Sequence, residues 1–510
     1  VSASITNTSI SAANRVEVYA GDAASISAGA AAGGGGPDAN GLAGAIVISH
    51  ITPTIAASIN SDGRGSAAIP VIDVGGGVTV TADSGSVSAY NAILANVITQ
   101  TNNGNAVSSD SGVDFTAAAA NGGAGNGPGA SITSVAGLVQ AGANNVGLSL
   151  VQNTIAQTHS ATLRGVDLTS TNDVTVIAAD RSKILGVTVG LGLVTGTCAG
   201  LASTTVNLID NTVLAQIGND SSTTATTKVH GRNIVVNAVN DSDVRGAAGT
   251  LGIGLGGAAV GLSLVYDSIL GSVTADIDGA LLSASQSVGV SATSDASILT
   301  VALGIALSKT VGVAGSVATS IIRTNVNANI RNTSDVIAND NVQVVSGNTN
   351  TIQAIAGAAG VGVQAAGVGI SVVANEIGGT TQAYIDGSTV DARGGGAGQN
   401  VNSGTLANGA FNVSTADDPS AALPDLSETQ VAVDGLAVVA SSHQAIVIDA
   451  VTLGLSFEPF VGDAAALTAV SNVAGGSTLA YINGSSVDTR LTASGGADVR
   501  VGASSQTYSR

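Results

Sequence analysis

The chain has 510 residues and contains no methionine, no tryptophan and a single cysteine, and aromatic residues make up only 2% of it. One cysteine excludes an intrachain disulfide. No initiator methionine opens the sequence, and neither does a basic segment followed by an apolar core. We therefore expect a mature or excised part of a longer protein, with any secretion signal removed or located outside it.

Charge is also scarce, at 10% of residues against about 25% in an average protein. The chain has 15 Lys and Arg against 34 Asp and Glu, a net charge of −19. This argues against nucleic acid as a partner, because phosphate binding needs a basic face. An acidic surface is compatible with solubility outside a cell and with divalent cations.

What the chain does have is 69 glycines and 44% hydrophobic residues, chiefly Ala, Val, Ile and Leu. That apolar content argues against disorder. Glycine, serine, threonine, asparagine and valine are weak helix formers, so a helical fold is also disfavoured. The uncharged stretches 184–206 and 352–373 have the length of a membrane span. They are rich in Gly and Thr or Gln and recur along the chain, once interrupted by Lys309, so we expect no membrane span.

An internal repeat is the strongest signal in the sequence. At seven places an Ala-x-Ile or Ala-x-Leu motif follows, by twelve residues, a small residue that is serine in five cases. An isoleucine follows six residues after the small residue in six of the seven repeats. The small residues are Ala45, Ser149, Ser203, Ser263, Ser316, Ser371 and Thr468, and the isoleucines are Ile51, Ile155, Ile209, Ile269, Ile322 and Ile377.

A Val-x-Val type pair precedes the alanine by 40 to 44 residues in six of the seven repeats. Seven repeats and the start of an eighth are expected, at 1–77, 78–173, 174–233, 234–287, 288–341, 342–430, 431–498 and 499–510. Two repeats carry polar insertions with glycine or proline, at about 99–134 and about 393–430. In a repeat array such insertions map to loops on the outside.

Each repeat reads as β-structure. Alternating strands such as "NVQVVSGNTNTI" lead into Gly/Ala-rich stretches, and "YIDGSTV" and "YINGSSV" place Asp-Gly and Asn-Gly where a positive φ is needed. A repeat of 54 to 62 residues is too short for an immunoglobulin-like sandwich of about 100 residues. We predict an all-β fold, an elongated repeat array of β-solenoid-like stacked strands, with each repeat forming two or three coils or one layer. The serines should then occupy equivalent positions, and the isoleucines should form an interior ladder.

The Gly/Ala-rich stretches are small or apolar at both even and odd positions, as in "AGAAGVGVQAAGVGISVV". A strand with one solvated face alternates apolar and polar residues instead. Both faces of these strands are therefore expected to be covered. The second cover is either another layer of the same repeat or another chain, which would make a fibre or bundle.

Two segments carry a resemblance to a known protein family: the repeat start "SVGVSATSDASI" (287–298) and the repeat ending "AYIDGSTVDA" (383–392). With the Gly/Ala-rich middle, they resemble the large secreted bacterial β-strand-repeat adhesins, which are filamentous haemagglutinin-like and leukotoxin-like filamentous proteins. The resemblance implies a secreted, cell-surface stalk or filament for adhesion. It implies no catalytic residue. The implied partners are copies of the chain, further repeats of the same polypeptide, and host or neighbouring-cell surfaces.

Catalytic motifs are missing from the sequence. His50, His159, His230 and His443 lie in different repeats without metal-ligand spacing, and we expect them exposed on strands or turns. Cys198 is expected to be a small buried thiol. No G-x-S-x-G elbow occurs, and "GIGLGG" lacks the surrounding βαβ unit of a dinucleotide site. We therefore predict a non-catalytic structural module.

Two alternatives stay open. A calcium-dependent surface-layer protein would use Asp-rich turns, with Asp241, Asp243, Asp335 and Asp340 as weak candidate ligands, because calcium needs several converging oxygens. Turn formation is the simpler interpretation of these residues. A carbohydrate-active β-helix enzyme would need clustered carboxylates and aromatic platforms, which six tyrosines, four phenylalanines and no tryptophan disfavour. No cofactor is predicted, apart from the calcium left open.

The chain opens on "VSASITNTSI" and closes on "ADVRVGASSQT", and neither segment resembles the cap that usually ends a repeat array. An uncapped strand edge is a template for another strand. We expect the strand at 499–501 to be completed by more of the same polypeptide or by the N-terminal region of another copy. Head-to-tail addition of this kind gives an open filament.

Overall fold

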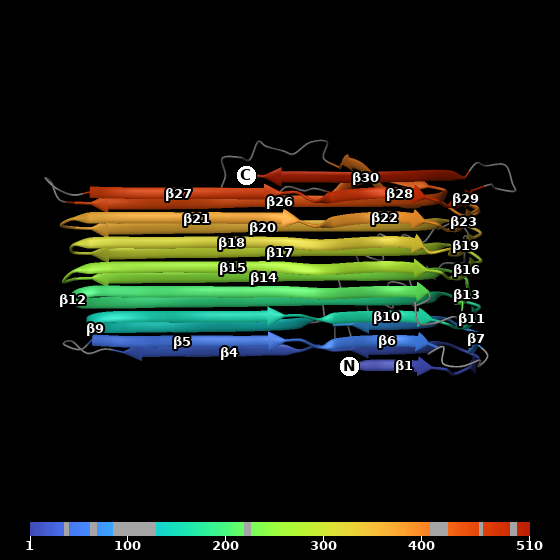
Figure 1. Cartoon of the computed structure of the whole chain (residues 1–510), viewed down its shortest axis with the longest axis horizontal. Coiled ribbons are helices and arrows are strands. Elements are labelled where there is room, and N and C mark those ends of the chain that lie inside the picture. Colours follow the sequence, from blue (N-terminus) through green and yellow to red (C-terminus); the bar gives the residue numbers. More distant parts are fainter. Residues whose placement is uncertain are drawn as a thin grey trace.

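The chain folds into β-strands throughout the described residues, which are 1–34, 40–61, 69–84, 129–218, 226–407, 427–457, 463–489 and 497–510 of the computed structural model. Figure 1 shows the strands running side by side across the molecule, and no helix occurs in these ranges. The predicted all-β class is therefore confirmed, as expected for alternating valine-, isoleucine- and threonine-rich segments.

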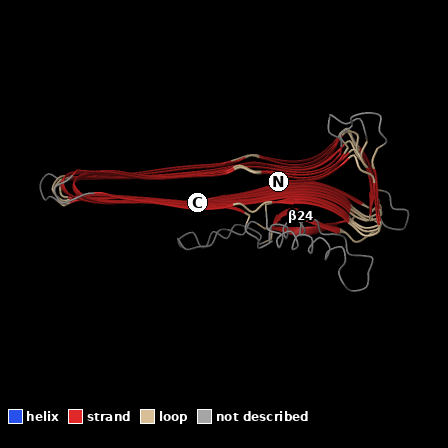
Figure 2. Ribbon diagram, turned by 90° about the horizontal axis from the view of Figure 1, so that it is seen from below, coloured by secondary structure: helices blue, strands red, loops and turns tan. Residues whose placement is uncertain are grey.

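Three strands make one winding of the chain. β14 (Ile234–Gly254) runs out, the chain turns at 255–257, and β15 (Ala258–Asp278) returns in a second layer. The short strand β16 (Leu281–Ala284) then crosses between the two layers, and β17 (Val288–Ser308) begins the next winding. Figure 2 shows the two long layers close together at one end, the thin end, and held apart by the short strands at the other, the wide end.

The remaining strands fall into the same three layers, apart from one hairpin. The outgoing layer also contains β3 (Val16–Gly21), β4 (Ser25–Gly34), β8 (Val78–Asp83), β20 (Val342–Gly362), β26 (Gly435–Ser456) and β30 (Asp498–Ser509). The return layer also contains β1 (Ser2–Thr6), β5 (Asn40–Ile51), β6 (Thr54–Asn60), β10 (Thr158–Arg164), β18 (Val311–Arg331), β21 (Ala366–Gly378), β22 (Thr380–Asp386), β27 (Asp463–Ala474) and β28 (Ser477–Asn483).

β9 (Ala130–Ile155) and β12 (Val174–Gly218) continue around the thin end and belong to both long layers. The short layer contains β16 together with β2 (Ile10–Ala12), β7 (Val71–Val74), β11 (Asp167–Ser170), β13 (Lys228–Gly231), β19 (Asp335–Ala338), β23 (Thr389–Ala392) and β29 (Ser486–Asp488). The hairpin consists of β24 (Gln399–Leu406) and β25 (Glu428–Val433), which pair antiparallel.

Neighbouring windings pair in parallel, residue against equivalent residue. β14 pairs with β17 from Ile234 opposite Val288 to Gly254 opposite Ser308, and β15 pairs with β18 in the same manner. Side chains alternate between the two faces of a strand, so each inward residue lies beside its counterpart in the next winding. Outward residues keep the same register, as shown by Tyr384 and Tyr481, whose rings stack with centroids 5.0 Å apart.

The residue columns expected from the sequence are register columns of the sheet. Ser203 pairs with Ser149 and Ser263, and Ser316 pairs with Ser263 and Ser371, which confirms the predicted equivalence of the serines. The isoleucine column is buried, and it too runs unbroken through the windings, as expected: Ile51, Ile155, Ile209, Ile269, Ile322 and Ile377. These partners lie one winding apart, so one sequence period spans one winding and not two or three coils.

Side-chain size sets the spacing of the two long layers. At the wide end, valine, leucine and isoleucine side chains from all three layers fill a common core. Toward the thin end the interior holds small residues such as Ala306 and Ala314. A Cβ at Gly360 would collide with the carbonyl oxygen of Val368 in the opposite layer, so glycine permits this close approach. The return strand of the same winding thus supplies the cover expected on the inner face.

The turns follow their predicted chemistry. Gly387 of the Asp-Gly pair and Gly484 of the Asn-Gly pair have φ values of 56° and 54°, in the left-handed region that favours glycine. Gly279, at the same corner between β15 and β16, has a φ of 62°. These corners turn the chain from the return layer into the short layer.

The two expected insertions are described in part. Residues 99–128 of the first lie outside the described residues, and its last residues already belong to β9, so the insertion ends earlier than expected. The second contains the β24–β25 hairpin, while 408–426 lie outside the described residues. The hairpin packs Val401 and Val433 over Val345 and Val439, on the outside of the outgoing layer (Figure 2), where an insertion was expected.

The two long uncharged stretches are strands. Residues 184–206 lie within β12, and 352–373 lie in β20 and β21 and the turn between them. Within the described ranges, no helix has the length and hydrophobicity needed to cross a membrane.

Candidate functional site

Polar side chains line the inside of the outgoing layer just beyond the apolar wide end. In β14 these are Asn240 and Ser242, both buried, between the inward-facing Ala238 and Val244. Equivalent positions on neighbouring windings hold Asp180 and Ser182, Ser294 and Ala296, Asn348 and Asn350, and Ser442 and Gln444. Buried polar groups need hydrogen-bond partners, and the facing layer supplies many of them.

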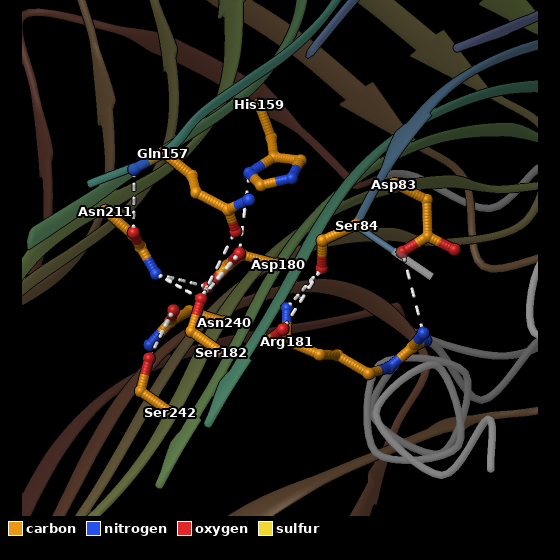
Figure 3. A network of polar contacts seen from close by, with 10 residues as sticks. All are labelled: Asp83, Ser84, Gln157, His159, Asp180, Arg181, Ser182, Asn211, Asn240 and Ser242. Carbon is orange, nitrogen blue, oxygen red and sulfur yellow. Dashed lines mark hydrogen bonds and ion pairs between the residues drawn. The ribbon is translucent and has the colours of Figure 1, made fainter. Parts of the chain in front are cut away.

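Asp180 is the centre of one such network (Figure 3). Ser182 Oγ lies 3.1 and 3.0 Å from its two carboxyl oxygens, and Asn211 Nδ2 donates to Oδ2 at 2.5 Å. His159 Nδ1 lies 3.6 Å from Oδ1, and the Gln157 backbone N–H donates to Asn211 Oδ1 at 2.9 Å. Asp180 and Ser182 come from the outgoing side and the other three from the return side, so the network ties the two long layers together.

Burial disfavours the charged forms of Asp180 and His159 in this network. It raises the pKa of Asp180 to about 7, although hydrogen bonds from Ser182 and Asn211 act in the opposite direction. It also lowers the pKa of His159 to about 3. Both side chains are fully buried. Between about pH 3 and pH 7 the carboxyl and the imidazole are therefore mostly neutral, which suits a dry interior.

A second buried carboxyl lies closer to the thin end. Asp267 accepts hydrogen bonds from Asn207 Nδ2 at 2.8 Å and from Thr300 Oγ1 at 2.6 Å, and burial raises its pKa to about 7. Asn153 Nδ2 donates to Asn207 Oδ1 at 2.8 Å. Asn153, Asn207 and Asp267 are register partners on three successive windings, so they form a polar ladder along the stack.

The serine, histidine and aspartate around Asp180 are the residue types of a serine hydrolase, but their hydrogen bonds are not those of a catalytic triad. Ser182 bonds to Asp180 and Asn211, whereas a serine nucleophile needs a base such as histidine against its hydroxyl. Asp180, Ser182 and His159 are all buried, away from any substrate. In a low-dielectric interior such networks fix the register of the layers they join.

A buried ion pair lies beside the network. Arg181 Nη1 is 3.5 Å from Asp83 Oδ1, and the two side chains are 3% and 0% exposed. The backbone N–H of Arg181 donates to Ser84 Oγ at 2.6 Å. These side chains point away from Asp180 (Figure 3), so the pair links neighbouring windings on the other side of β12.

The four candidate calcium ligands fall into two separate places. Asp241 and Asp243 face outward on β14, where Asp241 pairs in register with Asp295. Asp243 accepts from Arg245 Nε at 3.1 Å and from Ser297 Oγ at 3.0 Å. Burial, together with Asp241 and Asp243, raises the pKa of Asp295 to about 6.

Asp335 and Asp340 lie instead at the start of β19 and just beyond its end, in the short layer. No group of three or more His, Cys, Asp and Glu side chains suited to a metal is found in the described parts of the chain. The structure therefore does not bring the four candidates together, and calcium binding stays a prediction.

The histidine and cysteine expectations were partly wrong. His50 and His230 are exposed as expected, but His159 is fully buried between the two long layers, and His443 is only 9% exposed. His443 lies beneath the β24–β25 hairpin, where its Nε2 is 3.1 Å from Glu428 Oε1. Cys198 is exposed, because it lies where the chain rounds the thin end and not inside a layer.

Glu428 anchors the hairpin to the last windings. It accepts from Ser504 Oγ at 2.6 Å and from the Gly404 backbone N–H at 2.7 Å, in addition to its contact with His443. Burial raises the pKa of Glu428, but the hydrogen bonds from His443, Ser504 and Gly404 outweigh it and hold the pKa below its usual range. The contact with His443 joins the hairpin to β26 beneath it.

An open groove of about 500 Å³ follows the corner beyond the short strands. It is lined by polar residues from successive windings, among them His230, Arg232, Ser283, Asn339 and Arg393. Both guanidinium groups are already paired, Arg232 with Asp173 at 2.8 Å and Arg393 with Asp391 at 2.8 Å. The groove therefore offers hydroxyl and amide groups more than free charge.

Sequence reasoning missed the buried polar network, although a signal for it was present. Asp180 and Ser182 continue the same alternation as Val174, Val176 and Ala178, so they have the parity of core residues. Reading that parity through the repeats would have placed polar residues inside.

Compared with protein-family models, curated proteins and solved structures, the chain gives no match.

Proposed function

We propose that this chain is a non-catalytic structural module of a secreted or cell-surface bacterial filament or adhesin. In this proposal the windings form an elongated β-solenoid stalk that grows by adding strands at its ends. The in-register pairing of every long strand with its equivalent supports the proposal, because a stack of this kind extends without changing its contacts.

The observation that carries the proposal is the open edge of the last described winding. Within the part of the chain that the structure describes, β27, β28 and β30 each pair on one side only, with β21, β22 and β26. Val499 and Val501 are 50% and 46% exposed, although their register partners Leu436 and Val438 are fully buried. An added winding would cover this apolar surface and complete the strand pairing.

The opposite end of the stack offers a matching edge. β1 pairs only with β6, and β3 only with β8, within the described residues. Ala3 and Ile5 of β1 pack against the wide-end core from that side. The partner at either edge is therefore another winding, from a second copy or from more of the same polypeptide.

Neither alternative function gains support from a described site. A glycosidase needs two carboxyl groups flanking its substrate. The groove beside the short strands is lined instead by Arg232 and Arg393, which are paired with Asp173 and Asp391. A calcium-dependent surface-layer role would need converging oxygens from Asp241, Asp243, Asp335 and Asp340, which lie in different layers.

The substitution Val501→Lys tests the end-to-end joint. It places a charge on the uncovered end of the wide-end core, where an incoming winding would have to bury it. We expect electron microscopy and light scattering to show end-to-end particles for the unmodified chain and their loss for this variant.

The matched control is Leu479→Lys, which adds the same charge at the same end of the stack but on the outward side of β28, where Leu479 is 45% exposed. It should assemble like the unmodified chain. Particles of equal length from Val501→Lys, or isolated particles from the unmodified chain at every concentration, would refute the proposed joint.

A further inference from the structure

A wide apolar surface covers the outside of the outgoing layer near the thin end. It consists of the outward residues from Val187 to Leu193 on β12 and their register partners on β9, β14, β17, β20 and β26, which we call the flat face. Of its 24 positions, in four rows on six strands, 23 hold Gly, Ala, Val, Ile or Leu, and the exception is Asp449. Twelve of its large side chains are 38% to 63% exposed.

The fold itself explains why these side chains lie outside. The interior at the thin end is filled by small and hydrogen-bonded residues, as where Ser149 Oγ and Ser203 Oγ lie 2.9 Å apart. Leu138, Val194 and Leu201 are large apolar residues buried inside this end, and most of the others occupy the outer side of the strands. A contiguous apolar surface of this size marks an interaction site.

One row of the flat face alternates regularly between glycine and larger residues. Along the stack it reads Gly137, Val189, Gly249, Leu303, Gly357 and Val451, so that glycine alternates with a branched side chain. A Cβ added at Gly137 or Gly249 would meet nothing within 4 Å, so packing within this chain does not require glycine at either position. Glycine weakens a strand, and in this row it leaves furrows between the ridges of Val189, Leu303 and Val451. At Gly357 the furrow is partly covered by Leu303, whose Cδ2 lies 2.9 Å from the position of an added Cβ.

We propose that the flat face binds the flat face of a second copy of this chain. A two-fold axis that runs along the strands, between β14 and β17, reverses the order of the windings in the second copy. It places Gly137 opposite Val451, Val189 opposite Gly357, and Gly249 opposite Leu303. Every ridge then meets a furrow, and the same surface serves both copies, as a two-fold interface requires.

The area agrees with a stable dimer. Six strands about 4.8 Å apart and four rows about 6.6 Å apart cover roughly 750 Å². A typical stable interface buries about 800 Å² on each partner. Figure 1 shows the strands lying parallel across the windings with little twist, and untwisted sheets are usually held flat by stacking.

Lipid fits the flat face less well than protein. The flat face includes Asp449, and a carboxylate is costly in the hydrocarbon region of a bilayer. A second copy buries the apolar side chains and leaves Asp449 at a corner of the interface.

Sedimentation velocity of Leu303→Glu tests the interface. All proteins carry Val501→Lys, so that end-to-end joining, which the proposed function rests on, does not contribute. Leu262→Glu is the control, because Leu262 lies on the outside of the return layer with 41% exposure against 44% for Leu303. The parent and the control should dimerise, and Leu303→Glu should weaken the dimer by more than about tenfold. Circular dichroism checks that each variant is folded.

A parent that sediments as a monomer up to 100 µM, or equal weakening by both substitutions, would overturn the proposal. So would flotation of that monomer with phosphatidylcholine vesicles, which would assign the flat face to lipid.

Spin labels test the two-fold arrangement in a Cys198→Ser background. Arg245→Cys and Thr133→Cys label the row next to the flat face on the third and first of its six strands. In the two-fold dimer, the two labels at position 245 are displaced from each other by one strand across the sheets. The two labels at position 133 are displaced by five strands. The distance between labels should be shorter at 245, by on the order of 15 Å. Equal distances would overturn the reversed order of the windings.

Discussion

Gly246 and Gly249 lie three residues apart on β14 and face opposite sides of the strand. A Cβ at Gly246 would collide with the carboxyl oxygens of Asp267, whereas a Cβ at Gly249 would meet open space. Hydrogen bonds from Asn207 and Thr300 hold the Asp267 carboxyl in place, so it cannot simply move away. The two glycines therefore have different roles despite their closeness.

Substituting alanine at each position separates these roles. Gly246→Ala should lower the free energy of unfolding by about 1–3 kcal/mol through overpacking. Gly249→Ala should leave it unchanged or raise it by up to about 1 kcal/mol, because alanine is less flexible in the unfolded chain. Urea unfolding at low protein concentration measures both. Equal losses would show that Gly246 is not constrained by Asp267.

The buried carboxyl of Asp180 predicts a dependence of stability on pH. Its pKa is about 7 in the folded chain against an ordinary value of 3.8, so the folded state binds the proton more tightly. The free energy of unfolding should therefore fall as the pH rises from about 4 to about 7, by on the order of 2–4 kcal/mol from this group. Asp180→Asn, which does not titrate, should lose this part of the dependence.

Urea unfolding of both proteins at pH 4, 5.5 and 8 checks this expectation, with the variant gaining relative stability toward pH 8. His159 acts in the opposite sense, because its lowered pKa means that stability is lost as the pH falls from about 6.5 to about 3. His159 is present in both proteins, so the difference between them reports Asp180 together with its contact to His159. A difference that does not change with pH would contradict the buried-carboxyl interpretation.

At the scale of the elements, β18 contains two adjacent isoleucines, one buried and one partly exposed. Ile322 belongs to the buried isoleucine column and is 0% exposed, whereas Ile321 faces outward and is partly exposed. The column gains its stability from like side chains packed on the windings above and below. The two residues are of the same type, and the alternation of side chains along the strand places only Ile322 in the core.

Ile322→Ala should lower the free energy of unfolding by about 2–5 kcal/mol, because it leaves a cavity in a continuous apolar column. Ile321→Ala should cost less than about 1 kcal/mol. Chemical denaturation of the two variants, followed by circular dichroism, gives the comparison. A similar cost for both would mean that β18 is not fixed in the register described.

At the scale of the whole molecule, stability should vary along the stack. Central strands such as β15 and β17 pair on both sides, whereas β28 and β30 pair on one side and carry exposed side chains. Each winding contacts chiefly its neighbours, so the ends open with less free energy than the middle.

Hydrogen exchange in dilute solution should therefore be slower for the amides of β15 and β17 than for those of β28 and β30. Mass spectrometry of proteolytic fragments resolves the difference. If assembly covers the ends, raising the protein concentration should slow exchange in β30 and leave β15 unchanged. Uniform protection along the stack would show one cooperative unit instead.

The sequence by itself determined the all-β class, the identity of the interior columns and the left-handed corners. The reason is that each depends on local chemistry or on repetition: Ile269, Ile322 and Ile377 recur at one offset, and Asp-Gly and Asn-Gly pairs favour a positive φ. Repetition reports which residues meet their counterparts, but not how many strands one period contains.

Tertiary structure alone decided what fills the inside and what remains outside. Asp180 and His159 meet because a return strand lies opposite an outgoing one, and no spacing in the sequence encodes that distance. The same pairing fills the thin end with small residues and pushes Leu303 and Val451 outward, so a stretch that is apolar on both faces is covered on one. Alternation along a strand defines two faces, and only the packing of layers decides which face is buried.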